Sequence, residues 1–176
     1  FKAAPVDTKT GRLLAERFRV PVSSPCSRGE GLAAARQIVQ HFKWKGRVGI
    51  GFPAIVQEGH IGVVGNLGSE WEQQNGTRIF TKATGCRVAI ANDADAAGLA
   101  EMRFGAGKGR EGTVLMMTFG TGIGSALFYR GQLFPNVELG HIPWEGEPIE
   151  RFASAAVKTK LDLDWKEWTD RVNVYL

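Results

Sequence analysis

Hydrophobic and polar residues alternate along the first fifty residues in a pattern that predicts both strands and a helix. Apolar residues recur at helical spacing between residues 30 and 43 and predict an amphipathic helix. Before this helix, residues 1–7, the turn TKTG and residues 12–20 predict a β-hairpin. After the helix, the apolar run RVGIGF predicts a short buried strand. The order of these elements predicts a β–α–β crossing.

The next fifty residues again place strand and helix signals in succession. Residues 59–76 are rich in glycine and are expected to form a loop. A short helix is expected at residues 78–85, where Gly85 closes it. The apolar run RVAIA then predicts a second buried strand, and a helix begins directly after it at Asn92 and ends near Gly105.

The last third of the chain begins with two apolar runs that glycines separate. The runs TVLMMT and SALFYRG predict the two strands of a β-hairpin. Near the end, Asp164 is followed three residues later by Glu167, a pair that resembles the N-terminal cap of a helix. This helix would place Trp165 and Trp168 on its apolar face, so we expect both tryptophans to belong to the core.

The composition is that of an ordinary globular protein. The chain has 176 residues, of which 43% are hydrophobic and 23% are charged, enough for one large domain or two small lobes. Its net charge is +4. Because the basic residues are dispersed along the chain, this charge indicates a solvated surface and permits an anionic substrate. No nucleic-acid-binding signature accompanies it.

Membrane, secreted and zinc-binding proteins are disfavoured by the sequence. No apolar run approaches the roughly 18 to 20 residues that a membrane span needs. The first residues, FKAAPVDTKTG, lack the apolar stretch of a signal peptide, so we expect a cytoplasmic protein. Cys26 and Cys86 lie far apart in no metal-binding spacing, which predicts neither a disulfide framework nor a zinc site.

Residues 120–124, GTGIG, form what we name the glycine turn, at the tip of the predicted hairpin. It is not a Walker loop, because no Gly-Lys-Ser/Thr follows, and it is not a dinucleotide-binding fingerprint, because a strand follows it. The turn would expose backbone N–H groups that suit phosphate oxygens. The alternative is a tight hairpin that needs glycine only for a positive φ angle.

Three polar residues, Asn92, Asp93 and Asp95, directly follow the second buried strand. Ligands of open α/β sheets bind at the carboxyl ends of strands, so a working carboxylate is expected there. Asn and Asp are also preferred helix caps, and we expect one of the three to act only as a cap. An aspartate at this place could accept a proton from a substrate hydroxyl.

Glu138, His141 and Glu150 form a further polar group in the segment NVELGHIPWEGEPIERFAS. The group is poor as a metal site, because it lacks paired His or Cys ligands at a regular spacing. It suits a polyhydroxylated ligand better, since carboxylates and imidazole each bind hydroxyl groups. His41 and His60 are expected to be structural.

Four motifs stand in one order along the chain: NDADAAGLAE, TFGTGIGSALF, PNVELGH and ERFASAAV. Together they resemble the ROK family of sugar kinases, and within it the bacterial polyphosphate glucokinases. The resemblance covers nearly the whole chain. It implies a ribonuclease H-like, actin-type α/β fold of two lobes that close over the sugar, usually in a homodimer.

The resemblance also implies roles for individual residues. Asp93 matches the catalytic base that takes the proton from the terminal hydroxyl of the sugar. Gly120, Thr121 and Gly122 match the second phosphate-binding motif of the family. The residues that match sugar contacts are Asn66, Asn92, Glu138, His141 and Glu150. The implied reaction transfers a phosphoryl group from polyphosphate or ATP, with Mg²⁺ on the donor, to the 6-hydroxyl of glucose.

The chain departs from the family pattern in three places. The first phosphate motif would precede Phe1, and a region that contacts the nucleotide would follow Leu176, so we expect lobes at residues 1–107 and 108–176 that are incomplete at both ends. The segment IPWEGEPI lacks the zinc-binding cysteines of most members, which is typical of the polyphosphate branch. Two alternatives stay open: a non-catalytic, sugar-sensing transcriptional regulator, and an inactive fragment of the kinase.

Overall fold

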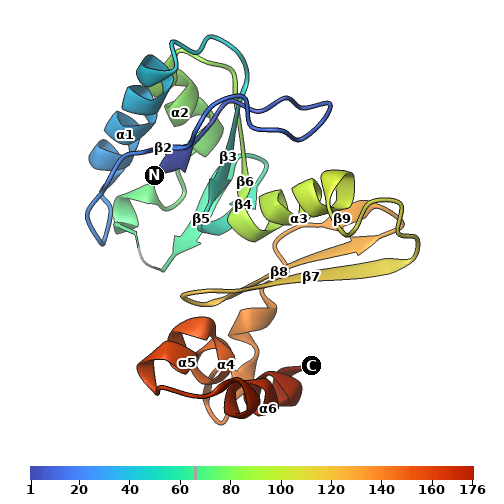
Figure 1. The fold of residues 1–176 in the computed structure, drawn as a ribbon. Helices are drawn as coiled ribbons and strands as arrows, with labels where there is room; N and C mark the ends of the chain where they lie inside the picture. The colour runs from blue at the N-terminus through green and yellow to red at the C-terminus, as the bar shows by residue number, and fades with distance from the viewer. Residues whose placement is uncertain (66) are drawn as a thin grey trace. The chain divides into compact units, whose positions relative to one another are not determined.

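The computed structural model describes residues 1–65 and 67–176 and divides into two compact units. The first unit is Phe1–Lys108 and the second is Gly109–Leu176 (Figure 1). Each unit has its own strands and helices and is described by itself.

The first unit begins with a short antiparallel pair, followed by a long helix. Strand β1 (Lys2–Ala3) pairs with β2 (Phe18–Arg19), so the predicted hairpin is present with a ladder of only two residues in each strand. Helix α1 (Arg28–His41) matches the predicted amphipathic helix. It begins where the Ser27 side chain accepts a hydrogen bond from the N–H of Glu30, as an N-cap does.

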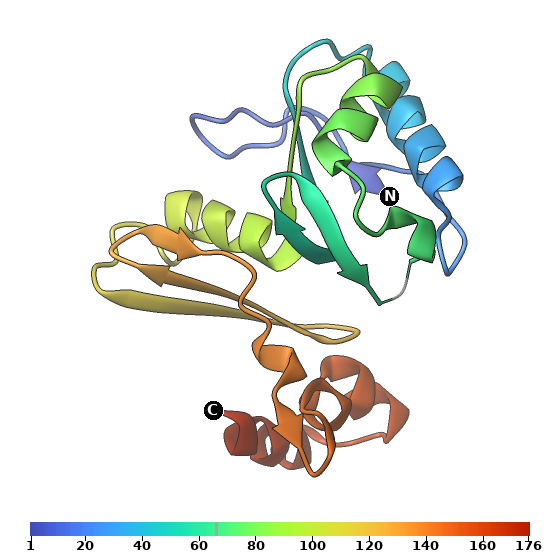
Figure 2. The same cartoon turned by 180° about the vertical axis from the view of Figure 1, so that it is seen from behind.

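Two parallel strands form the centre of the first unit. Strand β3 (Val48–Phe52) pairs in register with β6 (Val88–Asn92), and α2 (Gly76–Thr84) precedes β6 in the chain. Helix α2 lies beside α1 (Figure 2) and ends at Gly85, whose φ of 70° is the left-handed conformation predicted for this cap. The two strands and the helix that closes at Gly85 are therefore confirmed.

The expectation of a loop over residues 59–76 is wrong. Strand β4 (Ala54–Gln57) pairs with β5 (His60–Val64), and a 3-10 helix, η1 (Ser69–Trp71), follows. Glu58 and Gly59 join the two strands with φ angles of 49° and 79°, the left-handed pair of a two-residue hairpin. Gly59 therefore forms part of the turn of a hairpin. The apolar side chains of this hairpin alternate between the core and the surface.

Aromatic rings form the core of the first unit. Trp71 and Phe80 are fully buried and stack with a centroid distance of 5.5 Å, and Phe52 packs edge-on against Trp71 at 5.1 Å. The indole N–H of Trp71 donates to the carbonyl of Cys26, 3.0 Å away. These contacts join the segment before α1 to η1, α2 and β3, and the same core includes Val88 of β6, the strand that leads directly into α3 (Asp93–Phe104).

The second unit consists of an antiparallel sheet followed by three helices. Strands β7 (Thr113–Phe119) and β8 (Ile123–Tyr129) form the predicted hairpin, and β9 (Gln132–Phe134) extends it. A 3-10 helix, η2 (Leu139–His141), and a small hairpin of β10 (Pro143–Trp144) and β11 (Glu147–Pro148) come next.

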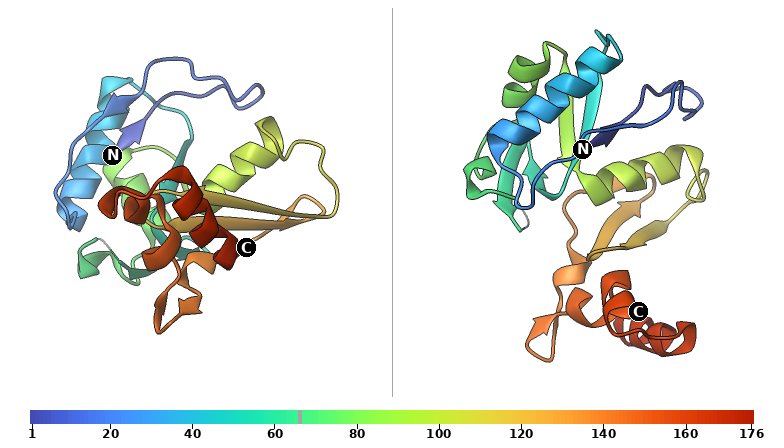
Figure 3. Two further views of the ribbon diagram at one scale, coloured as in Figure 1. Left: turned by 60° about the horizontal axis from the view of Figure 1, so that its bottom comes forward. Right: turned by 60° about the vertical axis from the view of Figure 1, so that its left-hand side comes forward.

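The three helices of the second unit are α4 (Glu150–Ala153), α5 (Ala155–Lys160) and α6 (Trp165–Tyr175), which lie together (Figure 3). Asp164 and Glu167 form the predicted capping box at the start of α6. Trp168 is half-buried, but Trp165 is 71% exposed, so the expectation that both tryptophans belong to the core is wrong for Trp165. The half-buried residues of α6 are Trp168, Arg171, Val172 and Tyr175, and Trp165 is not among them.

None of the helices in the described part of the chain combines the length and the apolar character that a membrane span requires.

Candidate functional site

Asn92 ends β6 and caps α3, as expected for one of the three polar residues at this place. Its Oδ1 accepts hydrogen bonds from the N–H groups of Ala94, at 2.8 Å, and Asp95, at 3.1 Å. Its Nδ2 donates to the carbonyl of Ala54, 3.2 Å away. The side chain is 6% exposed and therefore ties β6, α3 and β4 together at the carboxyl end of the sheet.

Asp93 is the exposed residue of this trio, whereas Asn92 and Asp95 are buried. Its Oδ1 accepts a hydrogen bond from the N–H of Ala94 at 2.9 Å, which orients the carboxylate at the first turn of α3. A Cβ atom at Gly51 would lie 3.2 Å from the Cα atom of Asp93, so the glycine of β3 allows the close approach. The fold thus presents a single accessible carboxylate at the carboxyl end of β6.

The glycine turn does not use positive φ angles. Gly120, Gly122 and Gly124 all lie outside the left-handed region, so the alternative of a hairpin that needs glycine for its φ is wrong. The N–H of Gly120 donates to the carbonyl of Gly122 at 2.9 Å, and Thr121 is exposed between them. A Cβ atom at Gly122 would lie 2.2 Å from Oε2 of Glu150. A side chain at position 122 would therefore overlap with the carboxylate of Glu150, which occupies the place of its Cβ atom.

Glu150 joins the glycine turn to His141. Its Oε2 accepts a hydrogen bond from the N–H of Ile123 at 3.1 Å, and its Oε1 lies 3.8 Å from Nε2 of His141. The side chain of Glu150 is 28% exposed and that of His141 is 62% exposed, so both are open to a ligand. Two predicted sugar-binding residues and the predicted phosphate turn therefore come together within the second unit.

The segment that carries Glu138 and His141 is held against the start of β8. A Cβ atom at Gly140 would lie 2.2 Å from the carbonyl oxygen of Ile123, so only glycine allows this contact. The hydroxyl of Ser125 accepts a hydrogen bond from the N–H of Leu139 at 3.1 Å. Ser125 and Gly140 were not predicted from the sequence, although small residues such as these are a signal of close backbone packing.

The predicted site residues fall in both units. Asn92 and Asp93 belong to the first unit, and the glycine turn, Glu138, His141 and Glu150 belong to the second. Asn66 lies outside the described residues. The two other histidines make contacts of their own: His41 stacks on Phe18 with a centroid distance of 3.8 Å, and His60 lies 3.4 Å from Asn75.

No three His, Cys, Asp or Glu side chains in the described ranges lie close enough together to hold a metal ion. Mg²⁺ commonly keeps several waters and is held by one or two carboxylates together with substrate phosphates. A magnesium ion that the donor phosphates and water hold needs no cluster of protein ligands, so the residues present are compatible with an ion that comes with the phosphoryl donor.

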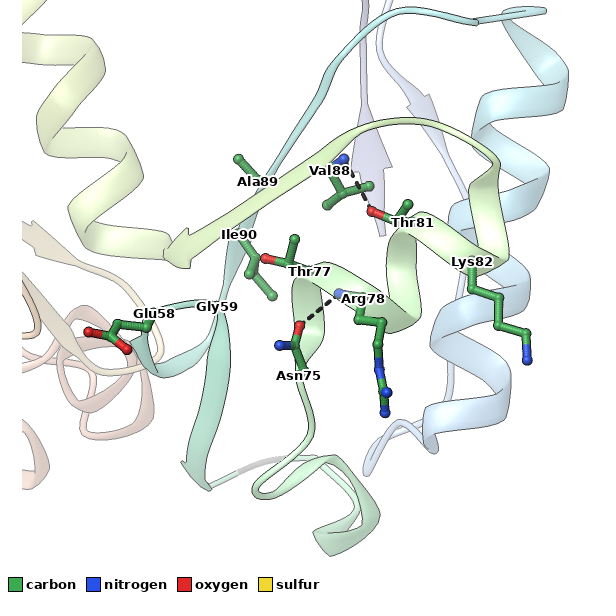
Figure 4. Close-up of a pocket in the computed structure, with 10 residues that line it drawn as sticks. All are labelled: Glu58, Gly59, Asn75, Thr77, Arg78, Thr81, Lys82, Val88, Ala89 and Ile90. Carbon is green, nitrogen blue, oxygen red and sulfur yellow. Dashed lines mark hydrogen bonds between the residues drawn. The ribbon is translucent and has the colours of Figure 1, made fainter.

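A shallow pocket of about 730 Å³ lies in the first unit, between α2, β6 and the turn of the β4–β5 hairpin (Figure 4). Figure 4 shows that Arg78 and Lys82 point away from the strand and that Glu58 points away from α2. The charged groups therefore do not converge on one point, and none of the predicted site residues lines the pocket. The pocket is not the candidate site.

The comparisons with known proteins agree with the motifs. The ROK family model matches residues 29–155. The polyphosphate glucokinase of Mycobacterium tuberculosis (strain ATCC 25177 / H37Ra) is 38% identical over 173 residues, which are 98% of this chain and 65% of that protein. The chain thus spans slightly less than two thirds of the length of this relative.

Two solved structures are similar over most of the chain. The inorganic polyphosphate/ATP-glucomannokinase from Arthrobacter sp. strain KM is 40% identical with a TM-score of 0.92, over 99% of this chain and 72% of that one. A ROK family glucokinase from Streptomyces griseus, in complex with glucose and AMPPNP, is 26% identical with a TM-score of 0.74, over 90% of this chain and 55% of that one. The predicted α/β sugar kinase fold is confirmed, and the chain belongs to the ROK family.

Proposed function

We propose that this protein is a glucokinase that transfers a phosphoryl group from inorganic polyphosphate or ATP to the 6-hydroxyl of glucose. One observation carries the proposal: the carboxylate of Glu150 contacts the backbone of the glycine turn at Ile123 and also approaches His141. Groups suited to sugar hydroxyls thus lie directly beside amides suited to phosphate. The names of relatives that are 38% and 40% identical support the same reaction.

In the proposed reaction the protein mainly positions its substrates and stabilises charge. Glu138, His141 and Glu150 hold the glucose hydroxyls, and the amides of the glycine turn hold the transferring phosphates. Asn92 was matched to a sugar contact, but it is buried and its side chain caps α3, so it holds the start of the helix that carries Asp93. Asp93 accepts the proton of the attacking hydroxyl. A magnesium ion that came with the donor would neutralise part of the charge that develops on the phosphoryl group.

Replacing Asp93 by Asn tests the proposed base. Asn keeps an oxygen that can accept the N–H of Ala94, so α3 and glucose binding should change little. Turnover should fall at least ~100-fold, the low end of the contribution of a positioned base. The measurement is the rate of glucose 6-phosphate formation by the complete gene product.

The matched control is Asp170→Asn, the same chemical change in an exposed ion pair with Lys166 on α6. This variant should retain wild-type turnover, because such surface pairs contribute little. Turnover of Asp93→Asn within a factor of three of the control would reject Asp93 as the base.

The donor is identified by the same assay with polyphosphate and with ATP at equal phosphate concentration. The positive net charge of +4 is compatible with a polyanionic donor. A polyphosphate-dependent rate that falls steeply with salt is expected, because dispersed surface charges are screened within about 10 Å at 0.1 M ionic strength. Failure to form glucose 6-phosphate from either donor would refute the proposed function.

A further inference from the structure

We propose that Trp168 on α6 is a positioning residue for the phosphoryl transfer, because it holds the glycine turn and the helix of Glu150 in a fixed relation. The role of the residue in catalysis rests on the proposed function. The contacts that define it lie entirely within the second unit.

The side chain of Trp168 contacts both the end of β7, which precedes the glycine turn, and α4, which Glu150 begins. Its ring packs edge-on against Phe119, with a centroid distance of 5.6 Å and an interplanar angle of 85°. Phe119 is the last residue of β7 and directly precedes Gly120. The indole N–H of Trp168 donates to the carbonyl of Ala153 at 3.0 Å. Ala153 ends the single-turn helix that Glu150 begins.

Helix α6 is suited to act as the support for these contacts. The helices α4 and α5 have four and six residues, whereas α6 has 11 residues and a complete capping box that stabilises its first turn. Arg171, one turn after Trp168, donates from Nη1 to the carbonyl of Phe152 at 3.2 Å and lies 4.8 Å above its ring. Two successive turns of α6 therefore hold α4 by its last carbonyls.

A third contact attaches the glycine turn to α5. The N–H of Ala156 in α5 donates to the carbonyl of Gly120 at 3.0 Å. The glycine turn is thus attached to α6 through Phe119, to α5 through Gly120 and to α4 through the carboxylate of Glu150. Trp168 contacts the first of these attachment points, Phe119, and also binds the last residue of α4.

The contacts of Trp168 affect the reaction through the distance between the two bound substrates. The glycine turn is the proposed site of the donor phosphates and Glu150 that of the sugar, so their separation sets the distance between the attacking hydroxyl and the phosphoryl group. A misplacement of about 1 Å costs on the order of 100-fold in rate. Loosening the support should therefore lower kcat more than it raises the KM for glucose, because several other groups still hold the sugar.

The kinetic test compares two substitutions of Trp168 with a matched control. Trp168→Phe keeps a ring against Phe119 but lacks the N–H donor, and we expect kcat to fall about 10-fold; Trp168→Ala lacks both contacts and should fall about 100-fold. The KM for glucose should stay within about threefold in both. The control, Trp165→Phe, makes the same change at a residue that is 71% exposed, and its phenyl ring keeps the edge-on contact of Trp165 with Trp168, so this variant should keep wild-type kcat.

The second measurement does not depend on activity. Amide hydrogen exchange of residues 119–123 and 150–156 should become faster in Trp168→Phe and stay unchanged in Trp165→Phe, because loss of the support increases local opening. A wild-type kcat in Trp168→Phe, or unchanged exchange in both segments, would overturn the proposal. An inactive wild-type protein would refute the proposed function instead, and the exchange data alone would then decide whether Trp168 holds the turn.

Discussion

Gly122 and Gly120 differ in what surrounds them, although they lie two residues apart in the same turn. A Cβ atom at Gly122 would lie 2.2 Å from Oε2 of Glu150, whereas one at Gly120 would meet no atom within 4 Å. Neither glycine has a left-handed φ angle, so backbone strain does not separate them. Alanine at each position therefore tests whether the carboxylate against the turn is required for function.

The size of the effect follows from the distances. Ordinary contact begins at 3.4 Å, so in Gly122→Ala the carboxylate oxygen must move by about 1.2 Å, the difference between 3.4 and 2.2 Å. This movement breaks its 3.1 Å hydrogen bond from Ile123. A hydrogen bond to a charged group contributes about 1.5–3 kcal/mol to stability, and Gly→Ala in a compatible conformation returns about 0.4–1 kcal/mol. Because Glu150 is partly exposed, we expect a net loss near the low end, about 1 kcal/mol.

The effect on function should exceed the effect on stability. Displacing Glu150 removes a charged partner of a sugar hydroxyl, which costs about 1.5–3 kcal/mol and lowers kcat/KM for glucose about 10- to 100-fold. Gly120→Ala should keep the wild-type KM for glucose and gain slightly in stability. The assays are glucose 6-phosphate formation at varied glucose and urea unfolding of each variant. A wild-type kcat/KM for glucose in Gly122→Ala would refute the assignment of Glu150 to the sugar.

Two further predictions concern the first unit. Phe80→Ala should lower the free energy of unfolding by about 3–5 kcal/mol, because the fully buried ring stacks on Trp71; a loss below 1 kcal/mol in urea unfolding would contradict this packing. The hydroxyl and N–H of Ser23 donate to Glu30 and lower the pKa of its carboxyl, so the stabilisation is present above the ordinary pKa near 4.5 and is lost as pH falls. Glu30→Gln should therefore be less stable than wild type at pH 7, and the difference should shrink as pH falls below 4.5, so a difference that does not change with pH would disprove it.

The sequence predicted the elements whose signals are local. The helix predicted at residues 78–85 is α2 (Gly76–Thr84), which ends at Gly85 as predicted, because its left-handed cap favours glycine and needs no distant partner. The β4–β5 hairpin was missed for the opposite reason. Its glycines were interpreted as a loop, but Ala54, Val56 and Ile61 are buried while Ile55 and Val63 are exposed, and this alternation depends on pairing across the turn.

The sequence motifs predicted which residues belong to the candidate site, but they did not predict which of these residues contact one another. The motifs identified Glu150 and the glycine turn, but 26 or more residues separate them in the chain, and their contact depends on how α4 packs against β8. Trp168 was expected only to fill the core, because its helix has an apolar face. Its donation to Ala153 and its contact with Phe119 are tertiary interactions that periodicity does not encode.

A carboxylate beside a phosphate site needs a physical reason, because like charges repel strongly in a partly desolvated site. The contacts of Glu150 supply one. Its Oε2 is held by the N–H of Ile123, while Oε1 is directed toward His141 and remains able to accept a sugar hydroxyl. The hydrogen bonds of the turn also engage the N–H of Gly120. We therefore infer that Thr121 and Gly122 provide the amides for the donor phosphates, and that Glu150 fixes which face of the turn the sugar occupies.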